Sequence, residues 1–179
     1  MRKVLLLILF ITALPVVASA ESVHLTFPVA TSQSINDISD TSYTNGHSIH
    51  YVGSSGFGIG LTELNWKGTT GNDNDTTSQP AKKINFTALE ISYTLGYITF
   101  GLGNPVNGLM QKTDGNSIYT YSIYSYSGNT AFATLALDIF EKGSLLIGYH
   151  MSSLTFKSST ADTESGTISN IMLGFRIPI

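Results

Sequence analysis

The chain ends in the stretch Gly166-Thr-Ile-Ser-Asn170-Ile-Met-Leu-Gly-Phe175-Arg-Ile-Pro-Ile179, and the pattern of this stretch decides the fold. Apolar side chains occupy every second position from Ile171 to Ile179, while Gly174 and Arg176 lie among the residues between them. Strict alternation is typical of a β-strand with one apolar face. Because small and polar residues on the other face suit a narrow polar interior, the stretch is predicted to be the closing strand of a small membrane β-barrel.

The same alternation recurs upstream and predicts about eight strands. Their apolar faces carry no charged side chain and form the predicted lipid face, made of Leu89, Ile91, Tyr93 and Leu95; Ile98, Phe100 and Leu102; Leu135, Leu137 and Ile139; and Leu145, Ile147 and Tyr149. One segment departs from the pattern. From Phe57 to Leu61 the apolar residues fall on odd positions, but they then become Leu64 and Trp66, which predicts a β-bulge near Glu63.

The connections between the predicted strands alternate in length. The long, polar ones are expected at 31–45, 68–82, 104–129 and 158–165, and the short turns at 53–56, 95–97 and 141–143. Within 104–129, the run Tyr119–Tyr126 fits either a loop or a strand. Long loops on one side and short turns on the other are typical of transmembrane barrels. The sequence therefore predicts an all-β, closed, antiparallel up-and-down transmembrane barrel, with a soluble sandwich or soluble barrel as the alternative.

The amino terminus has the features of a secretory signal peptide. A basic start precedes an apolar run, Val4 to Val17, and the small-residue cleavage motif Ala18-Ser19-Ala20. The apolar run is shorter than the ~20 residues that a spanning helix needs. We therefore predict a signal peptide over 1–20, one outer-membrane barrel domain over 21–179, and location in the outer membrane of a Gram-negative cell.

Composition excludes several other classes of protein. Without Arg2 and Lys3, 7 basic residues face 12 acidic ones, so the mature net charge is −5 and the chain lacks the basic surface that nucleic acid requires. The absence of cysteine rules out a disulfide framework and thiol-ligated metal sites. No motif indicates a cofactor or a metal. Charged residues make up only 12% of the chain, which suits strands that face lipid.

Two sets of side chains are predicted to have structural roles in the barrel. Polar residues on the inward faces, which must hydrogen-bond one another in a narrow lumen, are Glu90, Asp138, His150 and Arg176. We expect Arg176 to pair with Asp138 or Glu90 inside the barrel. Aromatic residues near the strand ends, predicted to form two girdles at the membrane surfaces, are Trp66, Tyr93, Tyr97, Phe140, Tyr149 and Phe156.

With this pattern the mature chain resembles the small outer-membrane barrels of Gram-negative bacteria, the OmpA-type transmembrane domains and opacity-like proteins. The resemblance implies a monomer that contacts outer-membrane lipid and lipopolysaccharide. It also implies that the terminal strand, 171–179, is read by the barrel-assembly machinery, which in that group recognises alternating apolar residues ending in an aromatic. Phe175 and Ile177 match the alternation, whereas the chain ends in Ile179 after Pro178.

Three functions follow from these predictions. A barrel of this size is filled by side chains, so we expect a structural or cell-surface binding role, with an extracellular ligand held by loops 68–82 and 104–129. The second is lipid hydrolysis, because His150-Met-Ser152 resembles the His-x-Ser motif of outer-membrane lipid A deacylases, with Glu164 as the acid. The third is a soluble, secreted barrel that binds a ligand.

Overall fold

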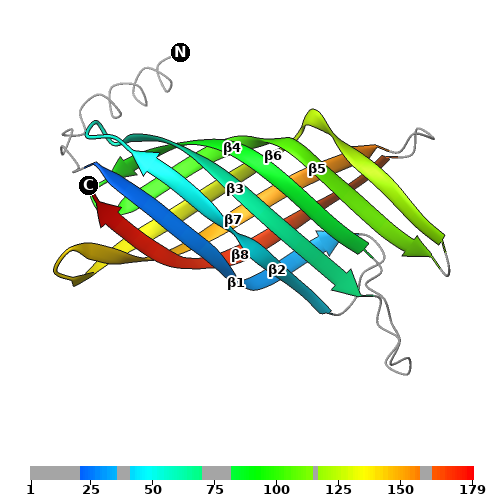
Figure 1. Ribbon diagram of the computed structural model, residues 1–179, viewed down its shortest axis with the longest axis horizontal. Helices are drawn as coiled ribbons and strands as arrows, with labels where there is room; N and C mark the ends of the chain where they lie inside the picture. Colours follow the sequence, from blue (N-terminus) through cyan, green and yellow to red (C-terminus); the bar gives the residue numbers. More distant parts are fainter. Residues whose placement is uncertain (1–20, 36–40, 70–81, 115–116, 158–162) are drawn as a thin grey trace, which may run out of the picture.

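In the computed structural model, the described residues, 21–35, 41–69, 82–114, 117–157 and 163–179, form eight β-strands. The strands are β1 (Ser22–Ile35), β2 (Thr41–Val52), β3 (Phe57–Thr69), β4 (Lys82–Leu95), β5 (Ile98–Asp114), β6 (Ser117–Phe140), β7 (Gly143–Lys157) and β8 (Thr163–Pro178). Each strand pairs antiparallel with the next, and β8 pairs with β1, so the sheet closes into a barrel (Figure 1). The predicted fold class is confirmed.

The two ends of the barrel differ, and we call them the short-turn end and the long-loop end. At the short-turn end, β2–β3, β4–β5 and β6–β7 are joined by tight turns, in which Gly56 and Gly96 have positive φ values of 85° and 61°. Glycine adopts this region without the Cβ clash that other residues meet. The chain enters β1 and leaves β8 at the same end, where the Ile179 amide donates to the Glu21 carbonyl over 2.9 Å (Figure 1).

The strands continue further towards the long-loop end than predicted. The segment 31–45 is mostly strand, because only 36–40 separate β1 from β2. The predicted loop 104–129 is wrong: β5 and β6 run on as a hairpin, leaving only 115–116 between them, and Tyr119–Tyr126 belongs to β6. Of the predicted loop 68–82, residues 70–81 lie outside the described part of the chain, as does the predicted signal peptide 1–20.

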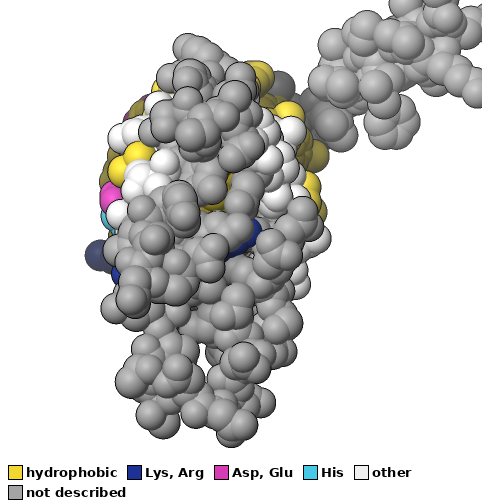
Figure 2. Space-filling view, turned by 90° about the vertical axis from the view of Figure 1, so that its right-hand side faces the viewer, with side chains coloured by type: hydrophobic (Ala, Val, Ile, Leu, Met, Phe, Trp, Pro, Cys, Tyr) yellow, Lys and Arg dark blue, Asp and Glu magenta, His cyan; other side chains and the backbone are white. Residues whose placement is uncertain are grey.

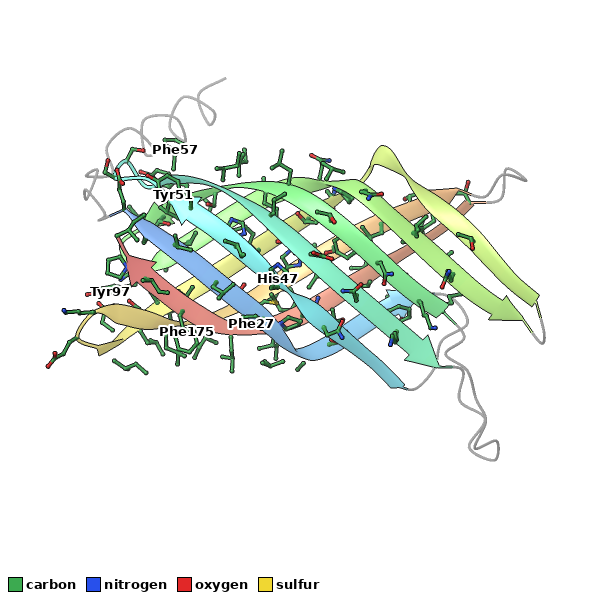
Figure 3. All side chains as sticks on the ribbon, viewed as in Figure 1. Phe27, His47, Tyr51, Phe57, Tyr97 and Phe175 are labelled. Carbon is green, nitrogen blue, oxygen red and sulfur yellow. The ribbon has the colours of Figure 1, made fainter. Side chains whose placement is uncertain are left out.

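An apolar belt surrounds the barrel on its outer face. Exposed apolar side chains follow one another at alternate positions, as predicted, and Figure 3 shows Phe27 and Phe175 standing outside the wall. The belt comprises Phe27, Val29, Ile49, Tyr51, Phe57, Ile59, Leu61, Leu89, Ile91, Ile98, Phe100, Leu102, Leu135, Ile139, Ile147, Tyr149, Ile171, Leu173, Phe175 and Ile177. Within the described ranges, no helix is both long and apolar enough to cross a membrane.

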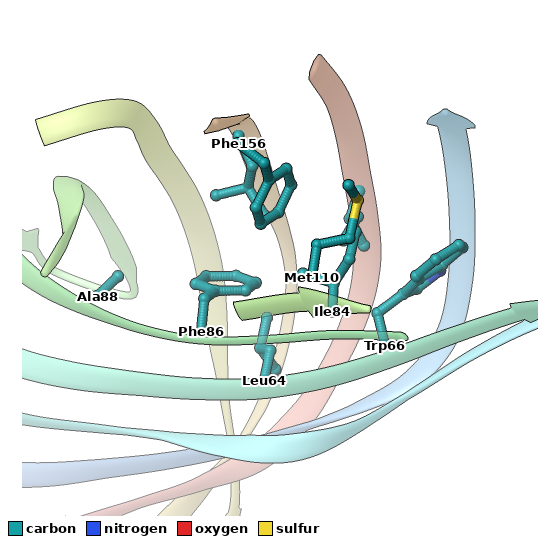
Figure 4. Close-up of a cluster of buried hydrophobic side chains, with 9 residues drawn as sticks. Leu64, Trp66, Ile84, Phe86, Ala88, Met110 and Phe156 are labelled. Carbon is teal, nitrogen blue, oxygen red and sulfur yellow. The ribbon is translucent and has the colours of Figure 1, made fainter. Parts of the chain in front are cut away.

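Beyond the belt, towards the long-loop end, the two faces of the wall exchange character. On β3 the outward residues change from Leu61 to Glu63, while the inward ones change from Thr62 to the buried Leu64 and Trp66. The inward apolar side chains form a lumen core near the long-loop end, made of Leu64, Trp66, Ile84, Phe86, Ala88, Met110, Leu154, Phe156 and Ile168 (Figure 4). Figure 2 looks onto this end and shows hydrophobic side chains, in yellow, on both flanks of the barrel.

The predicted bulge near Glu63 is wrong. The pairings of β3 with β2 and with β4 continue without a register shift from Gly58 to Gly68. The apolar residues moved to even positions because they line the lumen core, not because the strand changed phase. Register shifts lie elsewhere, for example between Pro28 and Ala30 where β1 pairs with β8. Proline lacks the N–H that a regular ladder would use.

Candidate functional site

Glu90 is the centre of a polar cluster inside the barrel. Its neighbours Leu89 and Ile91 face outward, so alternation along β4 turns the Glu90 side chain into the lumen, where it is fully buried. A buried carboxylate is costly unless hydrogen bonds and opposite charges compensate for its lost water. The surrounding strands must therefore supply these partners.

Four side chains from four other strands contact the two Glu90 oxygens. Oε1 accepts a hydrogen bond from Thr130 Oγ1 over 2.5 Å and lies 2.9 Å from His150 Nε2. Oε2 accepts one from Thr62 Oγ1 over 2.6 Å and lies 3.1 Å from His50 Nε2. A carboxylate offers about four acceptor positions, so each position of Glu90 is used. We call these five residues the Glu90 cluster.

Two glycines next to Glu90 make room for this cluster. Gly60 and Gly103 pair with Glu90 from β3 and β5. A Cβ on Gly60 would lie 2.4 Å from His50 Nδ1, and a Cβ on Gly103 would lie 2.5 Å from Glu90 Cγ. Distances this short do not occur between real side chains. Gly60 and Gly103 are therefore required by close packing around the carboxylate.

The cluster fills the lumen at its level. The Phe132 ring lies between two histidines, with centroid distances of 4.6 Å to His50 and 6.4 Å to His150. The cavity that remains beside these rings, and that His24 and Thr134 also line, has a volume of about 10 Å³. This is room for one water molecule at most. The described part of the lumen is therefore closed to solutes at this level.

Ser152, His150 and Glu90 are connected in the order of a hydrolytic relay. Ser152 Oγ lies 3.4 Å from His150 Nδ1, and His150 Nε2 contacts Glu90. The acid in contact with the histidine is thus Glu90; the side chain of Glu164, the acid predicted from the sequence, is not described. Ser152 is 0% exposed, so a substrate cannot reach its hydroxyl in this conformation. The arrangement holds the Glu90 cluster together but offers no accessible nucleophile.

The other two predicted lumen residues form a separate pair at the short-turn end. Arg176 Nη2 lies 3.1 Å from Asp138 Oδ1, and the Asp138 side chain is 48% exposed. Asp138 also accepts a hydrogen bond from Ser144. The Arg176 guanidinium donates weakly to the Gly96 carbonyl over 3.4 Å. The structure thus pairs Arg176 with Asp138, as one of the two predicted alternatives, but at a hydrated rim and apart from Glu90.

The prediction of two aromatic girdles is wrong for Trp66 and Phe156. Both side chains are buried in the lumen core, because even positions of β3 and β7 face inward (Figure 4). Tyr97 and Tyr149 are exposed, and Tyr93 packs at 4.9 Å and 6.0 Å from the rings of Phe57 and Phe100 near the short-turn end. The Phe140 side chain is not described.

Sequence reasoning missed three of the four partners of Glu90. His50 lies between the outward apolar residues Ile49 and Tyr51, so its inward direction was readable from the sequence, whereas Thr62 and Thr130 each have a polar neighbour, Glu63 and Asn129, that weakens the alternation. What could not be read was which strands bring them to the same level. Within the described ranges, no group of three histidine or acidic side chains is arranged to hold a metal ion. The contacts that the structure shows in the Glu90 cluster are hydrogen bonds and ion pairs among side chains that fill the lumen.

The comparisons with known proteins agree with this geometry. No protein-family model and no curated protein matches the chain. Among solved structures, it is similar to Neisserial surface protein A, with 13% identity, a TM-score of 0.57, and 89% of this chain and 96% of that chain covered. The chain has the fold of a small eight-stranded outer-membrane β-barrel. This confirms the resemblance stated from the sequence.

Two further solved structures are similar to this outer-membrane barrel fold at lower TM-scores. Outer membrane protein AlkL has 12% identity and a TM-score of 0.49, with 90% of this chain and 92% of that chain covered. Ail, the attachment invasion locus protein of Yersinia pestis, has 12% identity and a TM-score of 0.47, with 88% and 97% covered. Identities this low concern the fold and leave the function to be argued from the chain itself.

Proposed function

We propose that the chain is an integral outer-membrane barrel that carries a surface-binding role at its long-loop end and does not conduct solutes. The observation that carries this proposal is the apolar belt, which surrounds a lumen filled by its own polar side chains. A soluble protein would leave a contiguous apolar surface of this extent exposed to water, which monomeric soluble proteins rarely do. Lipid is the solvent that suits the belt.

The hairpin of β5 and β6 supports a role at the long-loop end. These are the longest described strands, with 17 and 24 residues, and Figure 1 shows the hairpin running past the neighbouring strands. Its tip remains paired as far as Asp114 and Ser117. A paired hairpin presents a more ordered surface than a loop, so a bound ligand has less conformational entropy to remove. The predicted loop 68–82, which connects β3 to β4 in the sequence, is the second segment to which we assign the binding role.

The proposed role is not catalytic. Ser152 is the one residue of the His-x-Ser motif that could act as a nucleophile, and it has no exposed surface. A deacylase must bring its nucleophile to a lipid outside the wall, whereas Ser152 faces the closed lumen. Ser152→Ala is therefore expected to leave the acyl chains of lipopolysaccharide unchanged. Loss of an acyl chain that depends on Ser152 would contradict the non-catalytic role.

Two experiments test the membrane and surface assignments. The protein extracted from outer membranes is expected to migrate faster on a detergent gel unheated than boiled, because a closed barrel resists detergent. Protease added to intact cells is expected to cut within 70–81 and spare the short turns. A protein that is soluble without detergent, or cleavage at the short turns alone, would overturn the proposal. Purified protein in planar bilayers is expected to show no conductance above the lipid background.

A further inference from the structure

We infer that the Glu90 cluster fixes the register in which the hairpins of the barrel assemble. The apolar belt alone does not fix it, because side chains alternate with a period of two and a shift of two residues keeps every apolar side chain outside. After such a shift Leu61 would lie opposite Ile91 instead of Leu89, and the apolar face would still meet lipid. The sheet would still close, as a barrel of different shear. A further interaction must therefore select the observed register.

The tight turns at the short-turn end fix only part of the register. A short turn determines how its own two strands pair, so β2–β3, β4–β5 and β6–β7 are hairpins of defined register. The junctions between these hairpins are less constrained. Segment 70–81 separates β3 from β4 in the sequence, and the pairing of β5 with β6 is interrupted between Gly103 and Leu109. The junctions β3–β4 and β5–β6 thus need contacts of another kind.

The Glu90 cluster joins the three hairpins across both junctions. Glu90 belongs to the β4–β5 hairpin, and each of its carboxylate oxygens is contacted by one neighbouring hairpin. Oε2 accepts a hydrogen bond from Thr62 and contacts His50, both on the β2–β3 hairpin. Oε1 accepts a hydrogen bond from Thr130 and contacts His150, both on the β6–β7 hairpin. One carboxylate therefore sets the relative level of three hairpins.

A shift of the β2–β3 hairpin by two residues would remove both contacts to Oε2. Each donor would move by about 7 Å along its strand, which is far beyond the reach of a hydrogen bond. The residues that would take the places of His50 and Thr62 are Val52 and Gly60 for one direction of the shift, and Ser48 and Leu64 for the other. At most one hydroxyl would then face the oxygen, and a buried carboxylate that loses its donors is costly.

The same holds for the β6–β7 hairpin and Oε1. The residues that would take the places of Thr130 and His150 are Phe132 and Gly148 for one direction of the shift, and Gly128 and Ser152 for the other. Again at most one hydroxyl would face the oxygen. Among registers that differ by two residues, only the observed one therefore supplies two partners to each oxygen of Glu90.

Cross-linking between introduced cysteines reads the register directly, because the chain has no cysteine of its own. Leu61→Cys with Leu89→Cys places two thiols directly opposite each other on β3 and β4 in the observed register. Ile59→Cys with Leu89→Cys, and Leu61→Cys with Ile91→Cys, do so only after a shift of two residues. Otherwise these pairs lie on the diagonal, about 7–8 Å apart, which is too far for a disulfide without backbone movement. Barrels extracted from outer membranes are oxidised, and the cross-linked fraction of each pair is measured.

The cluster variant removes the carboxylate together with the two hydroxyls that donate to it. It combines Thr62→Val, Glu90→Leu and Thr130→Val. Each histidine of the cluster keeps one partner, because their rings also contact the Ser48 and Ser152 hydroxyls over 2.7 Å and 3.4 Å. The variant is therefore expected to keep the heat shift of a closed barrel on a detergent gel.

In the wild-type protein, the pair for the observed register is expected to cross-link in higher yield than either shifted pair. The cluster variant is expected to lower this ratio of yields by about tenfold or more, the factor that one hydrogen bond to a charged group supplies. Glu141→Gln, which removes an exposed carboxylate in a turn, is expected to keep the wild-type ratio. Ile49→Cys with Leu61→Cys lies within one hairpin and is expected to cross-link equally in every variant.

A cluster variant that keeps both its heat shift and the wild-type ratio would overturn the inference. If the cluster variant does not form a barrel, Thr62→Val alone takes its place, because it is the milder change and removes one of the two contacts to Oε2. Thr62→Val is expected to lower the ratio roughly threefold, and an unchanged ratio in that variant would equally overturn the inference.

Discussion

Replacing Glu90 by glutamine is expected to be among the most destabilising changes of a single polar group in this chain. The substitution keeps the size of the side chain but converts one of its two acceptor oxygens into a donor. That donor then faces a threonine hydroxyl and a histidine nitrogen that both contact the carboxylate. Because Glu90 is 0% exposed, water cannot replace the lost acceptor. The substitution is therefore expected to raise the free energy of the folded state.

The magnitude follows from the four contacts. Hydrogen bonds to a charged group contribute about 1.5–3 kcal/mol each, and the desolvation of the carboxylate offsets much of their sum. Removing one partner of a buried charged group while the others remain typically costs about 3–5 kcal/mol. At about 1.4 kcal/mol per tenfold, the folding equilibrium constant is expected to fall on the order of 10²–10⁴-fold.

Trp66 provides the assay. It is the single tryptophan of the chain and lies buried in the lumen core, so its fluorescence reports loss of that core during denaturant titration in detergent micelles. Glu141→Gln is the matched control, because it removes an exposed carboxylate without a change of size. If Glu90→Gln unfolds within about 1 kcal/mol of this control, the carboxylate is not the centre of a stabilising network and the reasoning is refuted.

Three other tests separate the parts of the barrel. Trp66→Ala is expected to lower the free energy of unfolding by about 3–5 kcal/mol, measured by the midpoint of the gel heat shift in denaturant, because it empties the lumen core. Arg176→Leu is expected to cost less than about 1 kcal/mol in the same measurement, since its partner Asp138 is half exposed; a larger loss would place the pair in a drier site. Leu61→Arg places a charge in the belt and is expected to reduce insertion into lipid vesicles, with a loss of up to about 2–4 kcal/mol in the free energy of folding in the membrane. Asn65→Arg, beyond the belt on the same strand, is expected to insert like wild type. Equal insertion of the two variants would contradict the position of the belt edge.

The sequence was sufficient for the barrel because each strand carries its own signal. Alternation identifies the outward residues one strand at a time, and it needs no knowledge of neighbouring strands. Alternation gave a wrong prediction where the medium outside the barrel wall changes from lipid to water. At Leu64 and Trp66 the apolar residues moved to the inner face, which alternation alone reads as a change of phase. A β-bulge and an apolar lumen core produce the same pattern of apolar residues in the sequence. Only the register in which β3 pairs with β2 and β4 distinguishes the two structures.

The contacts of Glu90 needed information that no single strand contains. Its partners lie on β2, β3, β6 and β7, and the shear of the barrel decides which residues of these strands reach the same level. The shear in turn depends on register shifts, such as the one between Gly103 and Leu109 where β5 pairs with β6. These shifts leave little trace in the sequence. Predicting that Glu90 faces inward was therefore possible, whereas predicting its four neighbours was not.

On β3 the inner and outer faces change character at the same place, and the hydrophobic effect explains this step. Where the wall faces lipid, an apolar lumen core gains little, because lipid tails are as apolar as leucine and the unfolded chain loses nothing by staying among them. There a satisfied polar network such as the Glu90 cluster is the more effective filling, since its groups find no other partners in hydrocarbon. Where the wall faces water, burial of apolar side chains contributes about 25 cal/mol per Å², so Leu64 and Trp66 stabilise the barrel only beyond the belt. The step from Leu61 to Glu63 outside and from Thr62 to Leu64 inside therefore marks one boundary, the plane where hydrocarbon ends.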